Sequence, residues 1–335
     1  MRHALLEVLA CPRCQSRLAC LAETSAGGEV LSGSLECAPC GQRFPIVNGI
    51  PRFVPAENYA ASFGLQWNRF RLEQIDSDNF TRQSEQRFFS ETEWTSDWMK
   101  GKWLLEVGCG SGRFLEVASR APAQVVGVDL SNAVDAARQT LASRPNVHLV
   151  QASIYDLPFR RGAFDGCYCI GVIQHTPDPG RSLQALAPVL QPGGRIAVTV
   201  YERGRWTRFH AKYLLRTITR RMDPKLLLFL VRFFMPVLFP LTDLLFRIPK
   251  LGRVFRFCIP VANYVEKRDL SWRQRYRWAV LDTFDMLSPA YDQPMTESEV
   301  VAALGRAGIG GLKRLPNIGV NMVGEKSSVS AAVEA

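Results

Sequence analysis

The sequence of 335 residues predicts an α/β fold, in which a small metal-stapled module precedes a doubly wound, mostly parallel sheet. Two observations predict it. Short apolar runs alternate with helical patterns between residues 102 and 201, the order expected for a parallel sheet covered by helices. Two CxxC pairs lie ahead of that region, in a chain whose 47% hydrophobic content is typical of a folded protein rather than of a disordered or fibrous one.

The first element is the pair of motifs Cys11-Pro-Arg-Cys14 and Cys37-Ala-Pro-Cys40, which are separated by 22 residues. Each CxxC turn lets two thiolates face one point, and two such turns complete the tetrahedral shell that Zn²⁺ takes in structural sites. We therefore predict a zinc site formed by Cys11, Cys14, Cys37 and Cys40 in a domain of residues 1–55. The alternative is a pair of redox-active CxxC motifs without metal. So small a module has little core, and we expect that core to be separate from the core of the sheet.

The chain has nine cysteines, an odd number, and its N-terminal segment MRHALLEVLACPRC lacks the apolar run of a secretory signal. The sequence therefore predicts a reducing, cytoplasmic location, in which thiols or bound metal are expected rather than disulfides. The cysteines outside the two pairs are interpreted as small apolar side chains of the core. They are Cys20, Cys109, Cys167, Cys169 and Cys258.

Residues 56–100 form a polar and aromatic stretch with helical spacing. We expect helices here that lead into the sheet. Aromatic side chains such as Trp67 and Phe70 are interpreted either as core residues or as contacts to a ligand, with core packing the commoner role at such spacing.

Five strands are expected next, in the runs WLLEV, VVGVDL, VHLVQA, GCYCIGVI and RIAVTV. The first runs directly into glycines at 108, 110 and 112 and then into the helical stretch RFLEVASR. Glycines at that point permit a tight turn and let a ligand approach the backbone, beside a helix N-terminus that favours an anionic group. Asp129 ends the second run, where its carboxylate would accept hydrogen bonds from ribose hydroxyls. By itself the glycine pattern fits a dinucleotide site as well.

A basic and apolar segment then interrupts the alternation. Residues 203–277 hold 18 Lys and Arg against four Asp and Glu, a net charge of +14, whereas the rest of the chain is at −4. Such a charge should attract an acidic partner. The most apolar stretch, residues 226–246, is broken by two prolines, Arg232 and Asp243, so we do not predict a transmembrane helix there. Two alternatives remain for the segment: a helical cap with solvated arginines, or a surface that contacts an anionic membrane.

The alternation returns near the C-terminus. Thr296 and Glu299 form a capping box at the start of the helical pattern TESEVVAALGRAG, and short strands near Leu312 and at residues 320–324 are expected to close the sheet. We expect the Ser- and Ala-rich tail, residues 327–335, to be frayed. The predicted metal-stapled module spans residues 1–55, and the helical lead-in spans residues 56–100. The sheet domain spans residues 101–202 with 290–326, and the insertion spans residues 203–289.

The N-terminal block, LLEVLACPRC followed by LECAPCGQRFPIVNGIPRFVP, resembles the zinc-ribbon family typified by the small activator subunit of tRNA and protein methyltransferases. The resemblance covers roughly residues 4–54. It implies a structural metal and a docking surface, and implies little about chemistry by itself.

The glycine turn is an ExGxGxG pattern that begins at Glu106, and it resembles the first motif of class I S-adenosylmethionine-dependent methyltransferases, of the type 11-like group. The family's further motifs follow in order as Asp129, ASIYDLPFRRGAFD, CIGVIQHTPDP and LAPVLQPGGRIAVTVY. The resemblance covers about residues 65–205 and 290–325. It implies a Rossmann-like, doubly wound sheet of seven strands with a helical insertion between strands five and six, and S-adenosylmethionine as the cofactor. Within residues 56–100, the segment SFGLQWNRFRLEQIDSD resembles the N-terminal lid of related methyltransferases, which implies that the lead-in serves as a lid.

Carried over position by position, the resemblance implies that Gly108 and Gly110 lie against the methionine part of the cofactor, that Asp129 holds the ribose and that Leu130 packs on the adenine. The implied cofactor-binding residues are Glu106, Gly108, Gly110, Gly112, Asp129, Leu130, Ser153 and Ile154.

One of these positions departs from the family. The third strand commonly ends in an Asp that accepts from the adenine amino group, and here the position is Ser153. A serine oxygen accepts more weakly than a carboxylate. We therefore expect either lower cofactor affinity or a substitute in Asp156, while the backbone amide of Ile154 serves the ring nitrogen.

Methyl transfer from a sulfonium needs chiefly the positioning of the nucleophile and the exclusion of water, and it needs a base only where the acceptor loses a proton. His175 follows the fourth strand, at the edge where ligands bind in open α/β sheets, and is our candidate general base. The alternative is a loop histidine that orders the turn with Pro177 and Pro179. Gln174 and Tyr201 lie at corresponding strand ends and are weaker candidates.

These features predict an S-adenosylmethionine-dependent methyltransferase of a small-molecule or lipid-like acceptor, with the insertion forming the acceptor pocket. One rival is an RNA methyltransferase that binds phosphates through the ribbon and the basic segment. The Leu, Phe and Pro content of that segment suits an anionic membrane better than nucleic acid. A rival of another class is a non-catalytic adaptor with a vestigial methyltransferase domain. The intact glycines and Asp129 argue against it, and Ser153 leaves it open.

Overall fold

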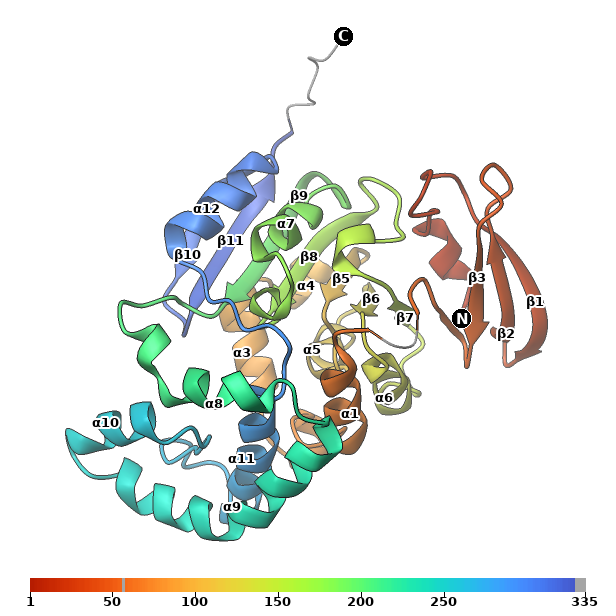
Figure 1. Ribbon diagram of the computed structural model, residues 1–335. Coiled ribbons are helices and arrows are strands. Elements are labelled where there is room, and N and C mark those ends of the chain that lie inside the picture. The colour runs from red at the N-terminus through yellow and green to blue at the C-terminus, as the bar shows by residue number, and fades with distance from the viewer. Residues whose placement is uncertain (56–57, 329–335) are drawn as a thin grey trace.

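The computed structural model describes residues 1–55 and 58–328. In this part of the chain a four-stranded sheet near the N-terminus stands beside a seven-stranded sheet with helices on both faces, and a further layer of helices lies at the opposite side (Figure 1). Of the tail that was expected to fray, residues 329–335 lie outside the described residues.

The N-terminal sheet is the predicted cysteine module. It follows the short helix η1 (His3–Glu7), and its antiparallel strands lie in the order β1 (Ala19–Ala26), β2 (Glu29–Glu36), β3 (Arg43–Val47) and β4 (Ile50–Pro51). Each CxxC motif folds into a turn, because the amide of Gln15 donates to the carbonyl of Cys11 and the amide of Gly41 donates to that of Cys37, both at 2.8 Å.

The lead-in is helical, as its spacing predicted. Its helices are α1 (Ala61–Arg69), α2 (Asp76–Asn79), α3 (Gln83–Thr92) and α4 (Ser96–Met99). Phe88 of α3 and Trp94 pack edge-on against Tyr168, with ring centroids 5.3 Å and 5.6 Å from it. These aromatic residues are therefore core residues of the sheet.

The seven-stranded sheet confirms the α/β fold class with two covered faces. Its strands are β5 (Trp103–Val107), β6 (Gln124–Asp129), β7 (Val147–Gln151), β8 (Phe164–Ile170), β9 (Leu190–Val200), β10 (Ile309–Leu315) and β11 (Val320–Lys326). They lie in the order β10-β11-β9-β8-β5-β6-β7, with β5 to β9 parallel and β11 antiparallel to β9. The strand order reverses between β5 and β8, which places their carboxyl ends where open α/β sheets bind ligands.

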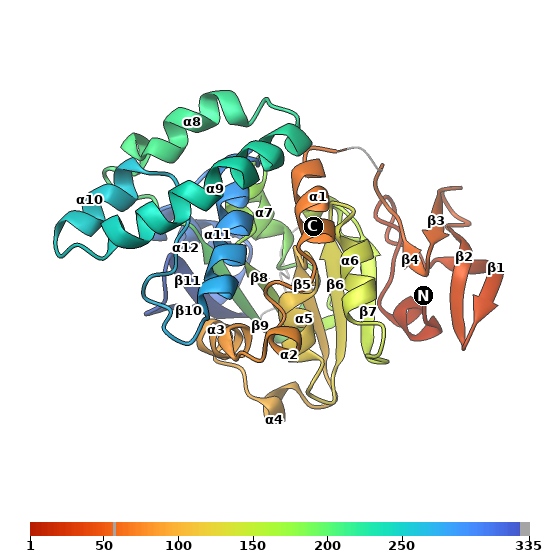
Figure 2. The same cartoon turned by 90° about the horizontal axis from the view of Figure 1, so that it is seen from below.

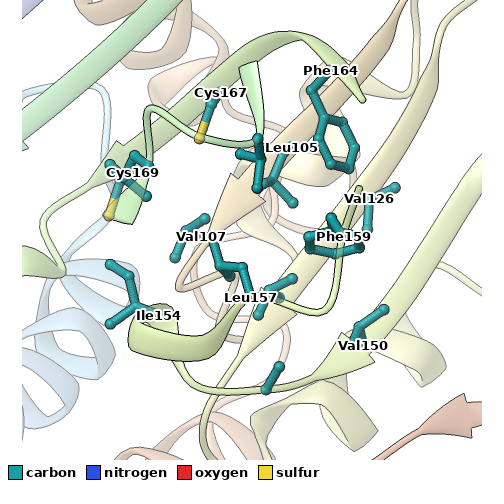
Figure 3. Packing of buried hydrophobic residues seen from close by; sticks show 14 of the residues in the cluster. Leu105, Val107, Val126, Val150, Ile154, Leu157, Phe159, Phe164, Cys167 and Cys169 are labelled. Carbon is teal, nitrogen blue, oxygen red and sulfur yellow. The ribbon is translucent and has the colours of Figure 1, made fainter. Parts of the chain in front are cut away.

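Alternate residues of the strands face two separate cores. Leu105 and Val107 point into the larger cluster, where Phe159 and Phe164 also pack (Figure 3), whereas Leu104 faces the cluster on the other side of the sheet. The covering helices are α5 (Arg113–Ala118), α6 (Ala133–Thr140), α7 (Pro179–Ala185) and α12 (Glu297–Arg306). The capping box predicted for α12 is present, with both the Thr296 and the Glu299 side chains bonded to backbone amides.

The expectation that the cysteine module has a core of its own is wrong. Its apolar residues, Leu5 and Leu9 among them, belong to the same buried cluster as Phe159 of the sheet domain. The module also continues the sheet at its β7 edge, since the amide of Phe53 donates to the carbonyl of Gln151 at 2.8 Å. The sequence missed this union because it depends on which two surfaces meet.

The insertion lies between β9 and β10, strands five and six of the sheet counted along the chain, as the resemblance implied. It comprises η4 (Thr207–Phe209), α8 (Ala211–Thr219), α9 (Pro224–Phe246), α10 (Leu251–Cys258) and α11 (Trp272–Leu287). A third core holds α9 against α11 and includes Phe70 of the lead-in. Figures 1 and 2 show α8, α9 and α10 as an outer layer, on the side of the molecule away from the cysteine module.

Helix α9 continues through Pro236 and Pro240, where the sequence suggested interruptions. By length and composition it is the one helix of the described residues that could cross a membrane. About a third of it, 33% of the most apolar window, is buried inside the protein, less than in a core helix, which is mostly buried. These criteria alone are nonetheless weak evidence for a membrane span.

Candidate active site

The glycine turn between β5 and α5 adopts backbone angles that only glycine accepts readily. Gly108 has φ +84°, and a Cβ there would lie 2.3 Å from the side chain of Val172. Gly110 has φ +52°, and a Cβ there would lie 3.0 Å from Nε1 of Trp67 in α1. The turn therefore packs against both the lid helix and the loop after β8, and Gly108 and Gly110 line a cavity together with Trp67 and Val172.

Asp129, at the end of β6, is bonded to this turn. Its Oδ2 accepts from the amide of Gly110 at 3.0 Å, and its Oδ1 accepts from the amide and hydroxyl of Ser131 at 2.8 Å and 2.7 Å. Burial raises the pKa of the Asp129 carboxyl, against the opposing effect of these hydrogen bonds. The carboxylate lines the same cavity as Gly110.

The structure brings most of the predicted cofactor residues to that cavity. Glu106, Gly108, Gly110, Asp129, Leu130 and Ile154 all line it. Glu106 is fully buried and its Oε2 accepts from the hydroxyl of Tyr168 at 3.2 Å, while burial raises the pKa of the Glu106 carboxyl well above its ordinary value. Gly112 is the residue that precedes α5 and does not line the cavity.

Ser153 and Asp156 are not brought to the cavity. The hydroxyl oxygen of Ser153 instead accepts from the amide of Tyr155 at 3.1 Å, which caps the short helix η2 (Ile154–Asp156). Asp156 is exposed to solvent. Of the residues considered for the adenine, Leu130 and Ile154 line the cavity, whereas the side chains of Ser153 and Asp156 do not.

His175 is buried in η3 (Ile173–His175) and lines the cavity. Its Nδ1 lies 3.0 Å from the carbonyl oxygen of Tyr291. Because a carbonyl can only accept, Nδ1 carries the proton in the neutral ring, and Nε2 is then an acceptor. Tyr201 also lines the cavity, whereas Gln174 does not, since its side chain bonds to the backbone of Gly171 and Tyr201.

The cavity measures about 1180 Å³ and extends well beyond the glycine turn. The lid helices α1 and α3, the ends of β5, β6, β8 and β9, and the insertion helices α8 and α11 all contribute to its walls. Lys212 of α8 helps to hold this enclosure together, because its Nζ forms a 2.8 Å ion pair with the buried Asp292. The insertion is thus a wall of the cavity as well as an outer layer.

Two carboxylates of α11 also line the cavity. Asp285 accepts from the side-chain amide of Gln66 at 3.0 Å, and Asp282 accepts from that of Gln74 at 3.4 Å. Gln66 is fully buried, and its Oε1 has no hydrogen-bond partner. Burial raises the pKa of Asp282 to about 7, and the negative charge of Asp285 adds to the effect.

The sequence analysis did not assign these carboxylates a role. Their signal was the spacing in DTFDM, since residues three apart share one face of a helix. That spacing does not say whether the face meets solvent, core or a cavity. No sequence pattern around Gln66 indicated that its side chain lines a cavity.

The four cysteines of the N-terminal module lie together, as predicted. Their sulfur atoms are all within 4.8 Å of one another, with Cys11 and Cys40 at 3.5 Å and Cys14 and Cys37 at 3.4 Å. Around Zn²⁺ with bonds of about 2.3 Å, tetrahedral thiolates stand about 3.8 Å apart. The cluster therefore fits a closed, structural zinc site.

Comparison with known proteins yields two family matches. Residues 105–198 match a family described as a methyltransferase domain, and residues 2–49 match the Trm112p-like proteins. Both agree with the resemblances drawn from the sequence, since a stretch similar to a methyltransferase domain follows one similar to the Trm112p-like proteins.

Individual relatives match over shorter stretches. A ubiquinone biosynthesis O-methyltransferase of Xanthomonas axonopodis pv. citri is 36% identical over 106 residues, 31% of this chain and 44% of the relative. An O-methyltransferase of Aspergillus nomiae is 29% identical over 130 residues, 37% of this chain and 54% of the relative. The chain thus spans about half the length of these relatives or less. Among solved structures, a complex that contains the Haloferax volcanii Trm112 methyltransferase activator is similar at TM-score 0.46 and 13% identity, over 82% of this chain and 99% of that chain.

Proposed function

We propose that the chain is an S-adenosylmethionine-dependent methyltransferase of a small-molecule or lipid-like acceptor, working in the cytoplasm. The observation that carries the proposal is the cavity of about 1180 Å³, which joins the glycine turn and Asp129 to a polar chamber under the insertion. Single ligand sites usually occupy about 300–1,000 Å³. A cavity above that range has room for a cofactor at one end and an acceptor at the other.

The residues at the first end fit the cofactor. Gly108 and Gly110 line the cavity with backbone that carries no side chain, and Asp129 offers carboxylate oxygens for ribose hydroxyls. Leu130 supplies apolar contact for the adenine, and the backbone amide of Ile154 can donate to the ring nitrogen. When bound, S-adenosylmethionine supplies a methyl group activated by a sulfonium. The chain's own contribution is to orient the two molecules and to exclude water.

The second end favours an acceptor that carries O–H or N–H donors. Asp282, Asp285 and the free Oε1 of Gln66 are hydrogen-bond acceptors, and a buried acceptor without a partner costs about 1–3 kcal/mol. A hydroxyl or amine of the acceptor molecule would satisfy them. The two relatives are named as O-methyltransferases, which supports transfer to oxygen, although their matches cover only part of this chain.

Two side chains are candidates to take the acceptor's proton. His175 presents Nε2 as an acceptor when its ring is neutral. Asp282 has a pKa raised to about 7, and a general base works best when its pKa lies near the working pH. We propose Asp282 as a second candidate base beside His175.

The RNA methyltransferase remains the rival enzyme. It rests on the +14 net charge of residues 203–277. Against it, the outer helices of the insertion expose large apolar side chains such as Phe233 and Val237, whereas nucleic-acid surfaces are strongly polar. The non-catalytic adaptor has less support, because the cavity beside the glycine turn is open.

Labelled S-adenosylmethionine tests the proposal. The purified chain is incubated with a cell lysate, and RNA, lipid and small-molecule fractions are then separated. We expect label in the lipid or small-molecule fraction, and less of it with Asp129→Ala. Label in RNA alone would establish the rival enzyme.

A further inference from the structure

Most of the large hydrophobic side chains that the described residues expose lie on a single stretch of the insertion, from Trp206 to Val254. They belong to η4, α8, α9 and α10, and we define the exposed apolar side chains of residues 206–254 as the apolar face. Monomeric soluble proteins usually expose large apolar side chains singly, so a concentration of them on one stretch of the chain marks an interaction site.

Helix α9 explains why the face is not an ordinary cap over the active site. Met235 and Phe239 are 1% and 0% exposed and pack in the core with α11, whereas Phe233 and Val237 are 65% and 70% exposed. Residues four apart share a side of a helix, so each pair lies on one side. The two pairs are offset by two residues, a rotation of about 200° in an α-helix, so their sides are opposite. One apolar side of α9 therefore has a protein partner, and the other has none in the described chain.

Cations gather at both ends of α9. Arg220, Arg221 and Lys225 stand at its N-terminal end, and Lys250 and Arg253 follow its C-terminal end. All five are exposed, and the ion pairs formed within residues 203–256 involve other cations. The structure describes all of residues 203–256, and the exposed acidic residue among them is Asp223, which caps α9. The face is thus apolar along α9 apart from the exposed Arg232, and positive at its ends.

The same helix is tied too firmly to the protein to cross a membrane by itself. Its inner side packs on α11, and the buried Arg275 of α11 joins Asp243 of α9 and Asn263 through its side chain. A spanning α9 would have to break this junction or carry Arg275 into the hydrocarbon, at a cost of several kcal/mol. The helix can instead lie in the plane of an interface.

We infer that the apolar face docks on the surface of an anionic phospholipid bilayer. Helix α9 lies along the interface, with its outer side chains among the acyl chains and the cations at its ends at the level of the headgroups. The inference stands apart from the proposed function, since it rests on exposed side chains and not on catalysis. Where both hold, the inner side of the docked insertion lines the chamber for a lipid-like acceptor.

Vesicle flotation of the full chain tests the inference. The protein is mixed with phosphatidylcholine vesicles with or without phosphatidylglycerol, at low and at high salt. We expect flotation with the anionic vesicles at low salt, weaker flotation with the neutral ones, and release at high salt, because surface charges are screened beyond about 8 Å at physiological ionic strength.

Two pairs of variants separate the apolar and the charged contributions. Phe233→Asp should weaken vesicle partitioning at least tenfold, since a buried Phe contributes about 1.5–3 kcal/mol. The control is Phe80→Asp, at a 96% exposed site outside the face, which should leave partitioning unchanged. Arg221→Gln should weaken it about fivefold, the equivalent of about 1 kcal/mol per cation, and Arg306→Gln on the exposed surface of α12 should not. Titration calorimetry with S-adenosylmethionine on the same variants shows whether the cofactor site is intact, independently of docking.

Several outcomes would overturn the inference. Protein that stays unbound with anionic vesicles at low salt would leave the face without a lipid partner. Membrane-bound protein that resists alkaline carbonate extraction would show that α9 spans. If the protein does not bind vesicles but forms a dimer that Phe233→Asp dissociates, the face is an interface with a second copy of the chain. If it does not bind vesicles but binds RNA, and Arg221→Gln weakens that binding, the face binds nucleic acid.

Discussion

Asp129 shows how one carboxylate can shape a site and still serve a ligand. It accepts hydrogen bonds from Gly110 and Ser131, which fix the glycine turn against the end of β6. Each carboxylate oxygen can accept more than one hydrogen bond, so ribose hydroxyls can bind without breaking the contacts to the turn. If the proposed function holds, removal of this side chain loosens the turn and deletes the ribose contact together.

We expect Asp129→Ala to weaken S-adenosylmethionine binding by about tenfold or more, because a hydrogen bond to a charged group contributes about 1.5–3 kcal/mol. Titration calorimetry measures the change. Asp156→Ala is the matched control, since that carboxylate is exposed and outside the cavity, and it should bind like the parent. Parent-like affinity in Asp129→Ala would mean that the cofactor site lies elsewhere.

Asp282 makes a prediction about stability and pH. Burial and the nearby Asp285 raise its pKa from the ordinary 3.8 to about 7. The folded state therefore holds a proton that the unfolded state has lost, and the contribution of this group to stability falls as the pH rises from about 4 to about 7. In Asp282→Asn this loss of stability with rising pH is absent, because the amide side chain does not titrate.

Thermal unfolding of Asp282→Asn and the parent at pH 4 and pH 8 checks this, because pH 4 lies at the lower edge of the window and pH 8 about a unit above its upper edge. The variant should gain stability relative to the parent by roughly 1 kcal/mol or more at the higher pH. Asp78→Asn, at an exposed site, should show no such difference. A parent and variant that differ equally at both pH values would show that Asp282 titrates in its ordinary range.

At the scale of elements, α12 and α9 show what local sequence signals can and cannot predict. The capping box of α12 was read from Thr296 and Glu299 alone, because capping is a contact between residues three apart. The prolines at 236 and 240 suggested breaks in α9, yet the helix continues through them. Its core contacts with α11 compensate for the backbone hydrogen bonds that prolines remove.

Thr296→Ala should lower the free energy of unfolding by about 1 kcal/mol, since the amide of Glu299 then loses its acceptor. Chemical denaturation measures it. Thr217→Ala, at an exposed position inside α8, is the control and should change stability by less than about 0.5 kcal/mol. An equal effect in the two variants would mean that the cap does not stabilise α12.

At the scale of the whole molecule, the cysteine module and the sheet domain form one folded body. Leu5 and Leu9 share a buried cluster with Phe159, and Phe53 bonds to the edge strand β7. Metal bound in the module therefore stabilises the sheet as well. The segment after this edge leads to α1, which covers the glycine turn through Trp67.

The purified protein should contain about one zinc per chain by elemental analysis. Cys14→Ser should lose that metal and destabilise the entire chain in a single unfolding transition, on the order of 5 kcal/mol, because structural zinc supplies folding energy. Cys258→Ser, at an exposed cysteine outside the cluster, should keep both the zinc and the parent stability. A second transition at the parental temperature in Cys14→Ser would show that the sheet folds without the module.

By itself the sequence determined the strands, the glycine turn, the zinc cluster and the capping box, since these follow from residues close together in the chain. It also predicted the insertion, because a change of composition marks it. Only the tertiary structure decided that Asp282 and Asp285 face the cavity, that Ser153 caps a helix and that the module shares the core of the sheet. It likewise decided which apolar side of α9 stays uncovered. The physical reason is that periodicity shows which residues share a face, whereas burial depends on the distant segment that packs against it.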